Sequence, residues 1–208
     1  MLKDVAKEGA YVALTAALAP LLGTARLHMA LSADDPYERY AMALSLLPGA
    51  LGWEVRRAFY RNTLRRCGRN LKLGFGSYFV SPETEVGENL HTGSYCVIGP
   101  VTIGDDVAMA SHISILDGLH QHGFTDMERP ILDQPGASEH VSIGSHTWIG
   151  EGARVAASVG EKSIVGVGAV VTRPVKPGAM VLGNPARVIG HRNRPLVRGG
   201  AGGGAGQA

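Results

Sequence analysis

Two histidines stand two residues apart in the stretch of the chain with the most potential for chemistry. His120 and His122 lie in an irregular segment, residues 117–131, that mixes titratable and aromatic groups and so differs from a flexible spacer. Imidazole changes charge near neutral pH, so it can take a proton from a weak nucleophile such as a hydroxyl group. A His-x-His pair also permits a metal site, but no cysteine or carboxylate stands at ligand spacing. We therefore expect proton transfer and no required metal.

The remaining histidines have no comparable setting. A lone histidine is usually solvated or structural, and nothing convergent surrounds His28, His91, His112, His140, His146 or His191 in the sequence. Between His120 and His122 the residues alone leave the choice open, because one imidazole can carry the base role while the other orients it.

The elements that must position this segment repeat every six residues. An aliphatic residue followed by a small one recurs at that spacing on both sides of the segment, with aliphatic members Val86, Ile98, Ile103, Met109, Ile115, Ile143, Ile149, Val155, Val165 and Val171. A period of six matches neither the periodicity of an α-helix nor the alternation of an ordinary strand. It fits one short strand and one tight corner per unit, with coils of three units stacking about 4.8 Å apart.

This pattern predicts a mainly β fold, a left-handed parallel β-helix with an N-terminal helical region. In it the aliphatic residue fills the interior, and the small residue after it is expected to adopt backbone angles that other residues avoid. The register breaks between Leu116 and Val141, and an unstructured loop of that length in a regular solenoid indicates a functional or disordered segment. Past Val171, prolines end the strands, so we expect the β-helix domain at residues 71–191 and a disordered Gly/Ala tail at 192–208.

Residues 1–70 are expected to form helices that cap the first coil. One helix should begin with Asp35 as its cap and Pro36 in its first position and run to about Leu47, and a second should run over residues 51–67. The second contains five arginines and one acid, Glu54. Two interpretations remain open. Its arginines could meet an anionic membrane surface, or the helix could cap the solenoid and leave them solvated.

Composition excludes several other classes. The uncharged run 10–25 is interrupted by Pro20 and Gly23 and is shorter than the roughly 20 apolar residues of a spanning helix, so no span is expected. A secretory signal is not expected either, because the basic residues near the start of the chain are offset by acidic ones. The net charge of +2 is too small to argue for nucleic acid, and two cysteines, Cys67 and Cys96, are too few for a disulfide framework. We expect a cytoplasmic protein that could lie peripheral to the inner face of the membrane.

Three motifs resemble the hexapeptide-repeat acyltransferases, in particular the galactoside, maltose and exopolysaccharide O-acetyltransferases. The similarity covers about residues 86–191, and its most specific stretches are residues 141–153, 165–173 and 183–189. A weaker similarity, at residues 45–49 and the basic helix that follows, is to members found beside polysaccharide assembly genes.

The resemblance implies roles for particular residues. A histidine five residues after the last aliphatic of a coil is the general base in that family, and Ile115 places this position at His120. Acetyl-CoA would lie along the flank of the solenoid, and the family motif carries its contacts onto Glu151, Val167, Thr172, Arg173 and Arg187. The family often has a further basic residue where Gly190 stands, so Arg192 could substitute for it. Trp148 could either fill a groove between subunits or touch the ligand.

The resemblance also implies a homotrimer with active sites between neighbouring solenoids. The function it indicates is acetyl transfer from acetyl-CoA to a sugar hydroxyl of a saccharide, polysaccharide or glycolipid precursor. Serine O-acetyl transfer and sugar N-acyl transfer on the same scaffold are alternatives. A non-catalytic solenoid, or one resembling a γ-carbonic anhydrase, is the non-transferase alternative, and the latter would need three metal-binding histidines at a spacing that the chain lacks.

Overall fold

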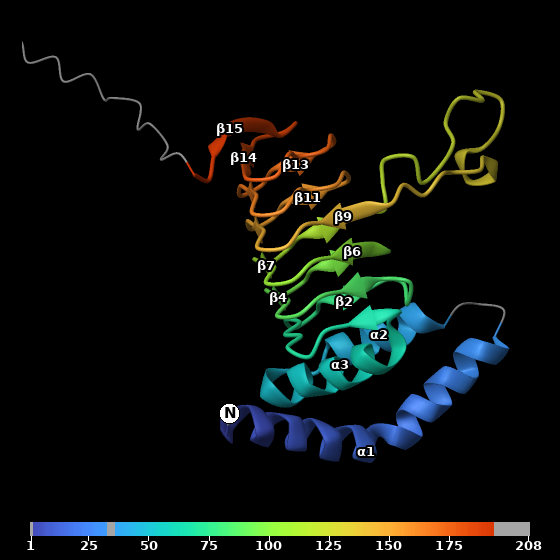
Figure 1. Ribbon diagram of the computed structural model, residues 1–208. Helices are drawn as coiled ribbons and strands as arrows, with labels where there is room; N and C mark the ends of the chain where they lie inside the picture. Colours follow the sequence, from blue (N-terminus) through green and yellow to red (C-terminus); the bar gives the residue numbers. More distant parts are fainter. Residues whose placement is uncertain (1, 33–35, 194–208) are drawn as a thin grey trace, which may run out of the picture.

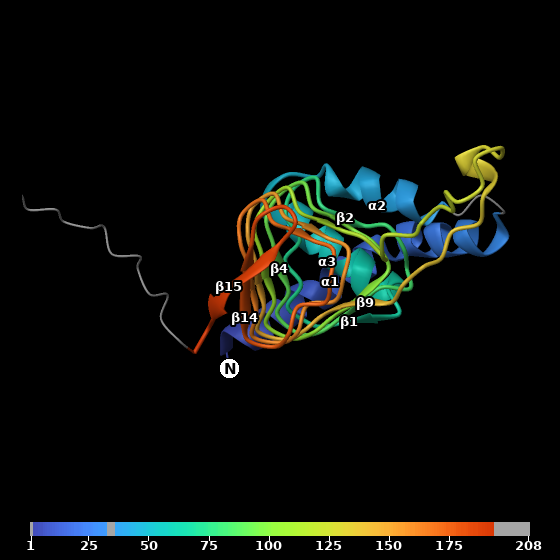
Figure 2. The same ribbon diagram turned by 90° about the horizontal axis from the view of Figure 1, so that it is seen from above.

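The computed structural model describes residues 2–32 and 36–193. Three helices form one end of the molecule, and the strands that follow stack above them in successive turns (Figure 1). Almost all strands pair in parallel, which confirms the mainly β architecture with N-terminal helices. Seen from above, the turns lie over one another (Figure 2).

Short strands form three sheets, and the chain visits each sheet once per turn. Sheet A contains β1 (Arg66–Cys67), β3 (Glu85–Val86), β6 (Val101–Ile103) and β9 (Val141–Ile143). Sheet B contains β4 (His91–Thr92), β7 (Ala108–Met109), β10 (Trp148–Ile149), β12 (Ile164–Val165), β14 (Ala179–Leu182) and β15 (Arg187–His191). Sheet C contains β2 (Tyr78–Phe79), β5 (Val97–Ile98), β8 (Ser114–Ile115), β11 (Arg154–Val155) and β13 (Val170–Val171).

The six-residue pattern sets the register of every sheet. In sheet C, Ile98 pairs with Ile115, Ile115 with Val155, and Val155 with Val171, so the repeat aliphatics stack directly over one another. All four are buried. The compact residues between successive repeat aliphatics are buried as well, among them Leu90, Cys96, Val107 and Ile113. Stacking of these side chains forms one continuous core along the coil.

Two features end the regular coil. Val159 and Val175 join sheet A only by isolated bridges, which matches the shortened spacing between Val155 and Val165 in the sequence. Beyond them β14 and β15 pair antiparallel, unlike the parallel coils below. Most of the tail expected to be disordered lies outside the described residues.

The expectation that the small residue after each aliphatic adopts unusual backbone angles is wrong. Gly150, which follows Ile149, has no positive φ, but a Cβ added to it would lie 2.7 Å from the backbone N of Val167 in the next coil. Glycine is needed there because of the close approach. The left-handed position falls two residues later, at Gly152 (φ 69°), and in other coils it is taken by Asn89, Tyr95, Asp106, His112, His146 and Lys162.

The helices differ from the expected ones mainly in their bounds. α1 (Leu2–Leu31) continues through Pro20 as one helix, and Figure 1 shows it bending near its middle, as a proline inside a helix causes. α2 (Tyr37–Ser45) begins after Pro36, and the cap expected of Asp35 lies outside the described residues. α3 (Gly49–Thr63) ends before residues 66–67, which form β1 and not the last turn of a helix.

α3 caps the first coil, and its arginines are not a solvated row. Val55 and Phe59 are buried, as the expected apolar stripe requires. Arg56 and Arg57 are buried as well. The guanidinium groups of Arg57 and Arg61 lie 5.2 and 3.9 Å from the ring centroid of Tyr11 in α1. These contacts favour the capping interpretation, because most of this basic surface is already covered by protein.

Arg56 is the most deeply buried charge among the side chains of this cap that the structure describes, with none of its surface exposed. Its Nη1 donates to the carbonyls of Leu44, Ser45 and Leu47 at 3.2, 3.1 and 2.8 Å, and its Nε donates to the carbonyl of Leu73 at 3.0 Å. The first three carbonyls lie at or just beyond the C-terminus of α2, where a cation is favoured. Arg56 thereby ties α2 and α3 to the first coil, although burial lowers its pKa.

The role of Arg56 predicts a large loss of stability in Arg56→Met. Methionine fills similar space but removes this donor. The carbonyls of Leu44 and Ser45 still accept from the backbone N–H groups of Leu47 and Gly76, whereas those of Leu47 and Leu73 lose the donor that Arg56 gives them. An unpaired buried carbonyl costs about 1–3 kcal/mol, so we expect a loss of at least about 2 kcal/mol. Urea unfolding measures it. The matched control is Arg66→Met, since Arg66 is exposed. Equal unfolding midpoints for the two variants would contradict the role given to Arg56.

The close approach at Gly150 predicts that Gly150→Val destabilises the coil by about 1–3 kcal/mol through overpacking. Gly152→Asn is its control, because no atom lies within 4 Å of a Cβ at Gly152 and asparagine tolerates left-handed angles. Thermal unfolding should therefore separate two glycines of the same corner. An unchanged melting temperature of Gly150→Val would show that coil spacing does not require glycine at Gly150.

Candidate functional site

The segment singled out in the sequence is a loop that leaves the coil between sheets C and A. It connects β8 to β9 and projects sideways from the stacked turns (yellow in Figures 1 and 2). Its two arms are held together by backbone hydrogen bonds from Ala137 N to His120 O at 2.7 Å and from Glu139 N to Asp117 O at 2.6 Å. Gln134 is buried and binds the backbone of Asp126 on the far side. The loop is therefore an ordered structure that can position a side chain.

His120 and Glu139 form a hydrogen-bonded pair at the base of this loop. Nδ1 of His120 lies 2.6 Å from Oε1 of Glu139, and both side chains are about half exposed. Gly118 allows this approach, because a Cβ there would lie 2.7 Å from Cβ of Glu139. Phe124 stacks near the imidazole with 6.3 Å between ring centroids. A carboxylate on Nδ1 fixes the tautomer that leaves Nε2 as a proton acceptor.

Glu139 was not foreseen from the sequence. It lies 19 positions from His120, and only the antiparallel pairing of the loop arms joins them. His122 is exposed and, within the part of the chain that the structure describes, makes no hydrogen bond or ion pair. The geometry therefore favours His120 over His122 as the oriented imidazole.

Three of the five predicted cofactor residues line one cavity. Thr172, Arg173 and Arg187 surround a hollow of about 240 Å³ near the upper end of the coil, beside Pro174 and Val188. Two exposed guanidinium groups beside one small cavity give it a positive lining suited to phosphate oxygens. Arg192, the suggested substitute at Gly190, does not line this hollow and instead donates to the carbonyl of His146.

Glu151 and Val167 lie together at a different corner, between sheets B and C. Gly168, next to Val167, donates its backbone N–H to the carbonyl of Glu151 at 2.8 Å. The side chain of Glu151 accepts from the backbone N–H of Ser111 at 3.0 Å, and Val167 is exposed. The five predicted residues therefore form two groups on two corners.

The loop and the cavity share one corner of the coil. Leu116, where the loop begins, donates to Val155, and Ala156 donates to Val171, so Leu116, Ala156 and Thr172 occupy equivalent places in successive coils. Two coil spacings of about 4.8 Å place the start of the loop roughly 10 Å from Thr172. The coil thus brings the imidazole loop and the arginine cavity to the same side.

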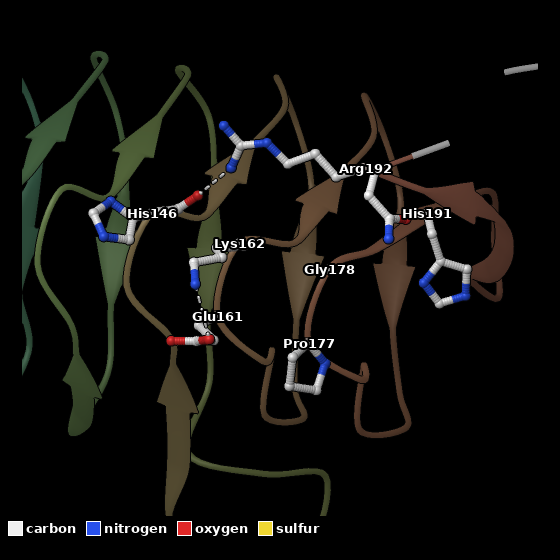
Figure 3. Close-up of a pocket in the computed structure, with 8 residues that line it drawn as sticks. His146, Glu161, Lys162, Pro177, Gly178, His191 and Arg192 are labelled. Atoms are coloured by element: carbon white, nitrogen blue, oxygen red, sulfur yellow. Dashed lines mark hydrogen bonds and ion pairs between the residues drawn. The ribbon is translucent and has the colours of Figure 1, made fainter. Parts of the chain in front are cut away.

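A second cavity, of about 570 Å³, lies at the corner between sheets A and B. It is lined by His146, Glu161, Lys162, Pro177, Gly178, His191, Arg192 and Asn193. Figure 3 shows Arg192 donating to the backbone of His146, and Lys162 pairing with Glu161. His146 and His191, expected to be solvated or structural, line this cavity and are absent from the lining of the arginine cavity.

Three further residues considered above have surroundings that could not be predicted from the sequence. The ring of His112 stacks on Tyr95 with centroids 5.3 Å apart, and both residues occupy left-handed positions that glycine fills in other coils. Trp148 is partly exposed and lines a cavity of about 300 Å³ with Arg192. Burial and the nearby Lys72 lower the pKa of His91. Among residues 2–32 and 36–193, no three His, Cys, Asp or Glu side chains are grouped as metal ligands.

No protein-family model matches the chain. It is 30% identical over 122 residues to the bifunctional protein GlmU of Acidithiobacillus ferrooxidans, which covers 56% of this chain and 27% of that protein. It is 34% identical to the serine acetyltransferase of Mycobacterium tuberculosis, over 43% of this chain and 37% of the relative. It is 31% identical to WbbJ of Escherichia coli, named as an O-acetyl transferase of lipopolysaccharide biosynthesis, over 56% of this chain and 62% of WbbJ. The chain thus matches between about a quarter and two thirds of these relatives.

Solved structures share the fold. A maltose O-acetyltransferase from Clostridium difficile superposes with a TM-score of 0.66 at 24% identity, covering 74% of this chain and 84% of that one. A galactoside acetyltransferase in complex with coenzyme A gives 0.65 at 22% identity, covering 83% and 82%. Together with the sequence relatives, these structures confirm the resemblance to hexapeptide-repeat acetyltransferases.

The His120–Glu139 pair predicts a defined tautomer. When the imidazole of His120 is neutral, its Nδ1 should carry the proton and its Nε2 should not. The ¹⁵N chemical shifts of the two ring nitrogens report this tautomer. Glu139→Gln offers an amide that can instead donate to Nδ1, so the proton should move toward Nε2. Glu128→Gln, elsewhere on the loop, should leave the spectrum of His120 unchanged. Identical ring shifts in the wild type and Glu139→Gln would mean that the pair does not set the tautomer.

Proposed function

We propose that this chain, a relative of hexapeptide-repeat acetyltransferases, is an acetyl-CoA-dependent O-acetyltransferase acting on a sugar hydroxyl of a saccharide, polysaccharide or glycolipid precursor. The observation that carries the proposal is the contact of Nδ1 of His120 with Glu139 at 2.6 Å, on an ordered loop that leaves the coil at the corner occupied by Thr172 of the arginine cavity. A sugar hydroxyl is a weak nucleophile at neutral pH and needs such a base to attack a thioester.

His120 is the general base in the proposed reaction. Its Nε2 accepts the hydroxyl proton as the sugar oxygen bonds to the thioester carbonyl carbon, and Glu139 stabilises the imidazolium that forms. The C–S bond then breaks, the ester carbonyl re-forms, and the proton on Nε2 passes to the departing thiolate. The products are the acetylated sugar and free coenzyme A, and no acyl-enzyme is needed.

Acetyl-CoA is the acetyl donor in this proposal and not a resident cofactor. The guanidinium groups of Arg173 and Arg187, beside the hydroxyl of Thr172, suit its phosphates. Glu151 and Val167 lie at corners where an extended pantetheine arm can contact backbone groups. The coenzyme A complex of a galactoside acetyltransferase with the same fold supports this choice of donor.

A homotrimer of left-handed parallel β-helices is part of the proposal. The predicted contacts occupy two different corners of the solenoid, in successive coils, and the loop of His120 projects away from its own solenoid. A neighbouring copy can bring a loop against the other corner, and closed threefold packing satisfies every such interface. We also assign the protein to the cytoplasm, in peripheral contact with the inner face of the membrane.

Two alternatives have specific support. Identity to a serine acetyltransferase keeps serine as a candidate acceptor, and sugar N-acyl transfer would use the same base. The sugar hydroxyl is favoured because WbbJ and the two superposed structures carry names of saccharide acetyltransferases. A non-catalytic solenoid would have no use for a histidine held by a carboxylate. Thioester consumption with serine, aminosugars and neutral sugars as acceptors separates these candidates.

Replacement of the proposed base tests the assignment. His120→Ala should lower turnover by roughly 10²–10⁴-fold and leave acetyl-CoA affinity nearly unchanged, because the imidazole acts on the acceptor proton. Thiol release measures turnover, and calorimetric titration measures acetyl-CoA affinity.

His122→Ala is the matched control, since it removes an exposed imidazole from the same loop without touching Glu139. It should keep most of the activity. If the control loses activity while His120→Ala keeps it, the base is His122 and the assignment fails.

A further inference from the structure

The helical end of the molecule has an outer surface unusual for a protein surrounded by water. α1 packs inward through Leu18, Leu22, Ala25 and Met29, which recur at helical spacing. A surface helix normally places polar and charged residues opposite such a stripe. No charged residue occurs between Glu8 and Arg26, so the outward side of α1 is apolar too.

Large apolar side chains stand exposed on this outward side. Val12 is 60% exposed, Leu27 60% and Leu31 77%, and alanines fill much of the surface between them. Residues 11–31 are long and apolar enough to cross a membrane by length and composition, yet only 11% of this apolar stretch is buried in the protein. α1 is therefore not a core helix that happens to be apolar.

Charge distinguishes this end of the molecule from the rest. Residues 1–70 contain ten Lys and Arg against six Asp and Glu, whereas residues 71–208 contain ten against twelve. Arg39 of α2 and Arg66 of β1, in the first coil next to the helices, are exposed and, among the described residues, make no ion pair. The apolar helix thus belongs to the positively charged end, a combination that complements an anionic lipid surface.

We propose that α1 lies in the surface of an anionic lipid bilayer and docks the protein there by its base. α1 runs beneath α3 at the end of the coil opposite β14 and β15 (Figure 1), and Tyr11 and Arg26 hold it against α3. In this position α1 lies along the membrane and does not cross it. The docking element is α1 and not the basic helix α3, whose Arg56 and Arg57 are buried.

Vesicle flotation of the full chain, without acetyl-CoA or acceptor, tests the docking surface separately from catalysis. The protein should bind vesicles of phosphatidylcholine with about 30% phosphatidylglycerol, and binding should weaken at high salt and with pure phosphatidylcholine. The triple variant Val12→Gln, Leu27→Gln, Leu31→Gln should lower the partition coefficient at least about tenfold, because glutamine keeps the helix but not the apolar surface. Absence of binding by the wild type would overturn the proposal.

A matched triple variant controls for apolar surface elsewhere. Met127→Gln, Ile131→Gln and Leu132→Gln change exposed residues of the loop between β8 and β9 and should leave vesicle binding unchanged. If this variant loses binding and the α1 variant keeps it, the loop docks and the proposal fails. Light scattering tests the alternative that a second copy of the chain packs on α1. If the α1 variant dissociates an oligomer while vesicle binding is unchanged, a second copy of the chain covers α1 and the membrane assignment is wrong.

Arg39→Gln with Arg66→Gln tests the electrostatic part. Both side chains are exposed, so the fold should be unaffected, and binding to anionic vesicles should fall several-fold while its salt dependence becomes shallower. Unchanged binding and salt dependence would contradict charge complementarity. In cells, alkaline carbonate should release the protein from membranes, whereas resistance to that wash would indicate a spanning α1 and overturn the surface position.

Discussion

The distance between successive coils is the constraint on which the rest of the structure depends. Strand pairing fixes it at about 4.8 Å, so the backbone of one coil lies against the corner of the next. At Gly150 this leaves no room for a Cβ beside Val167. The same spacing stacks Ile115, Val155 and Val171 into a continuous core. The glycine at the close approach, the aliphatic residues of the core and the register of strand pairing therefore all follow from the one distance between successive coils.

A stacked coil leaves an end that must be covered, and here the cover is attached through a buried charge. Arg56 binds carbonyls at the end of α2 and the carbonyl of Leu73 in the first coil. The carbonyl groups at the helix end carry the partial negative charge that a buried guanidinium requires. Because these contacts use the inner side of the helical layer, the apolar outer side of α1 remains available for the lipid surface proposed above.

The regular coils also explain how a long loop can hold a side chain in a defined position. The chain leaves the coil after Leu116 and returns at Val141, so both ends of the loop are fixed by strands of the same solenoid. The arms then pair, and Glu139 meets His120 across 19 positions of sequence. The repeat thereby provides the rigid base, and one interruption of the repeat provides the groups suited to proton transfer.

The sequence by itself determined the repeating architecture, the interrupted coil and the loop that contains His120 and His122, because a period of six and its interruption are local patterns. It also indicated which residues could bind acetyl-CoA. Tertiary structure decided the partner of His120, the burial of Arg56 and the true reason for Gly150, and it divided the cofactor candidates between two corners. Each of these depends on contact between residues of different coils or loop arms, and separation in sequence does not reveal such contacts.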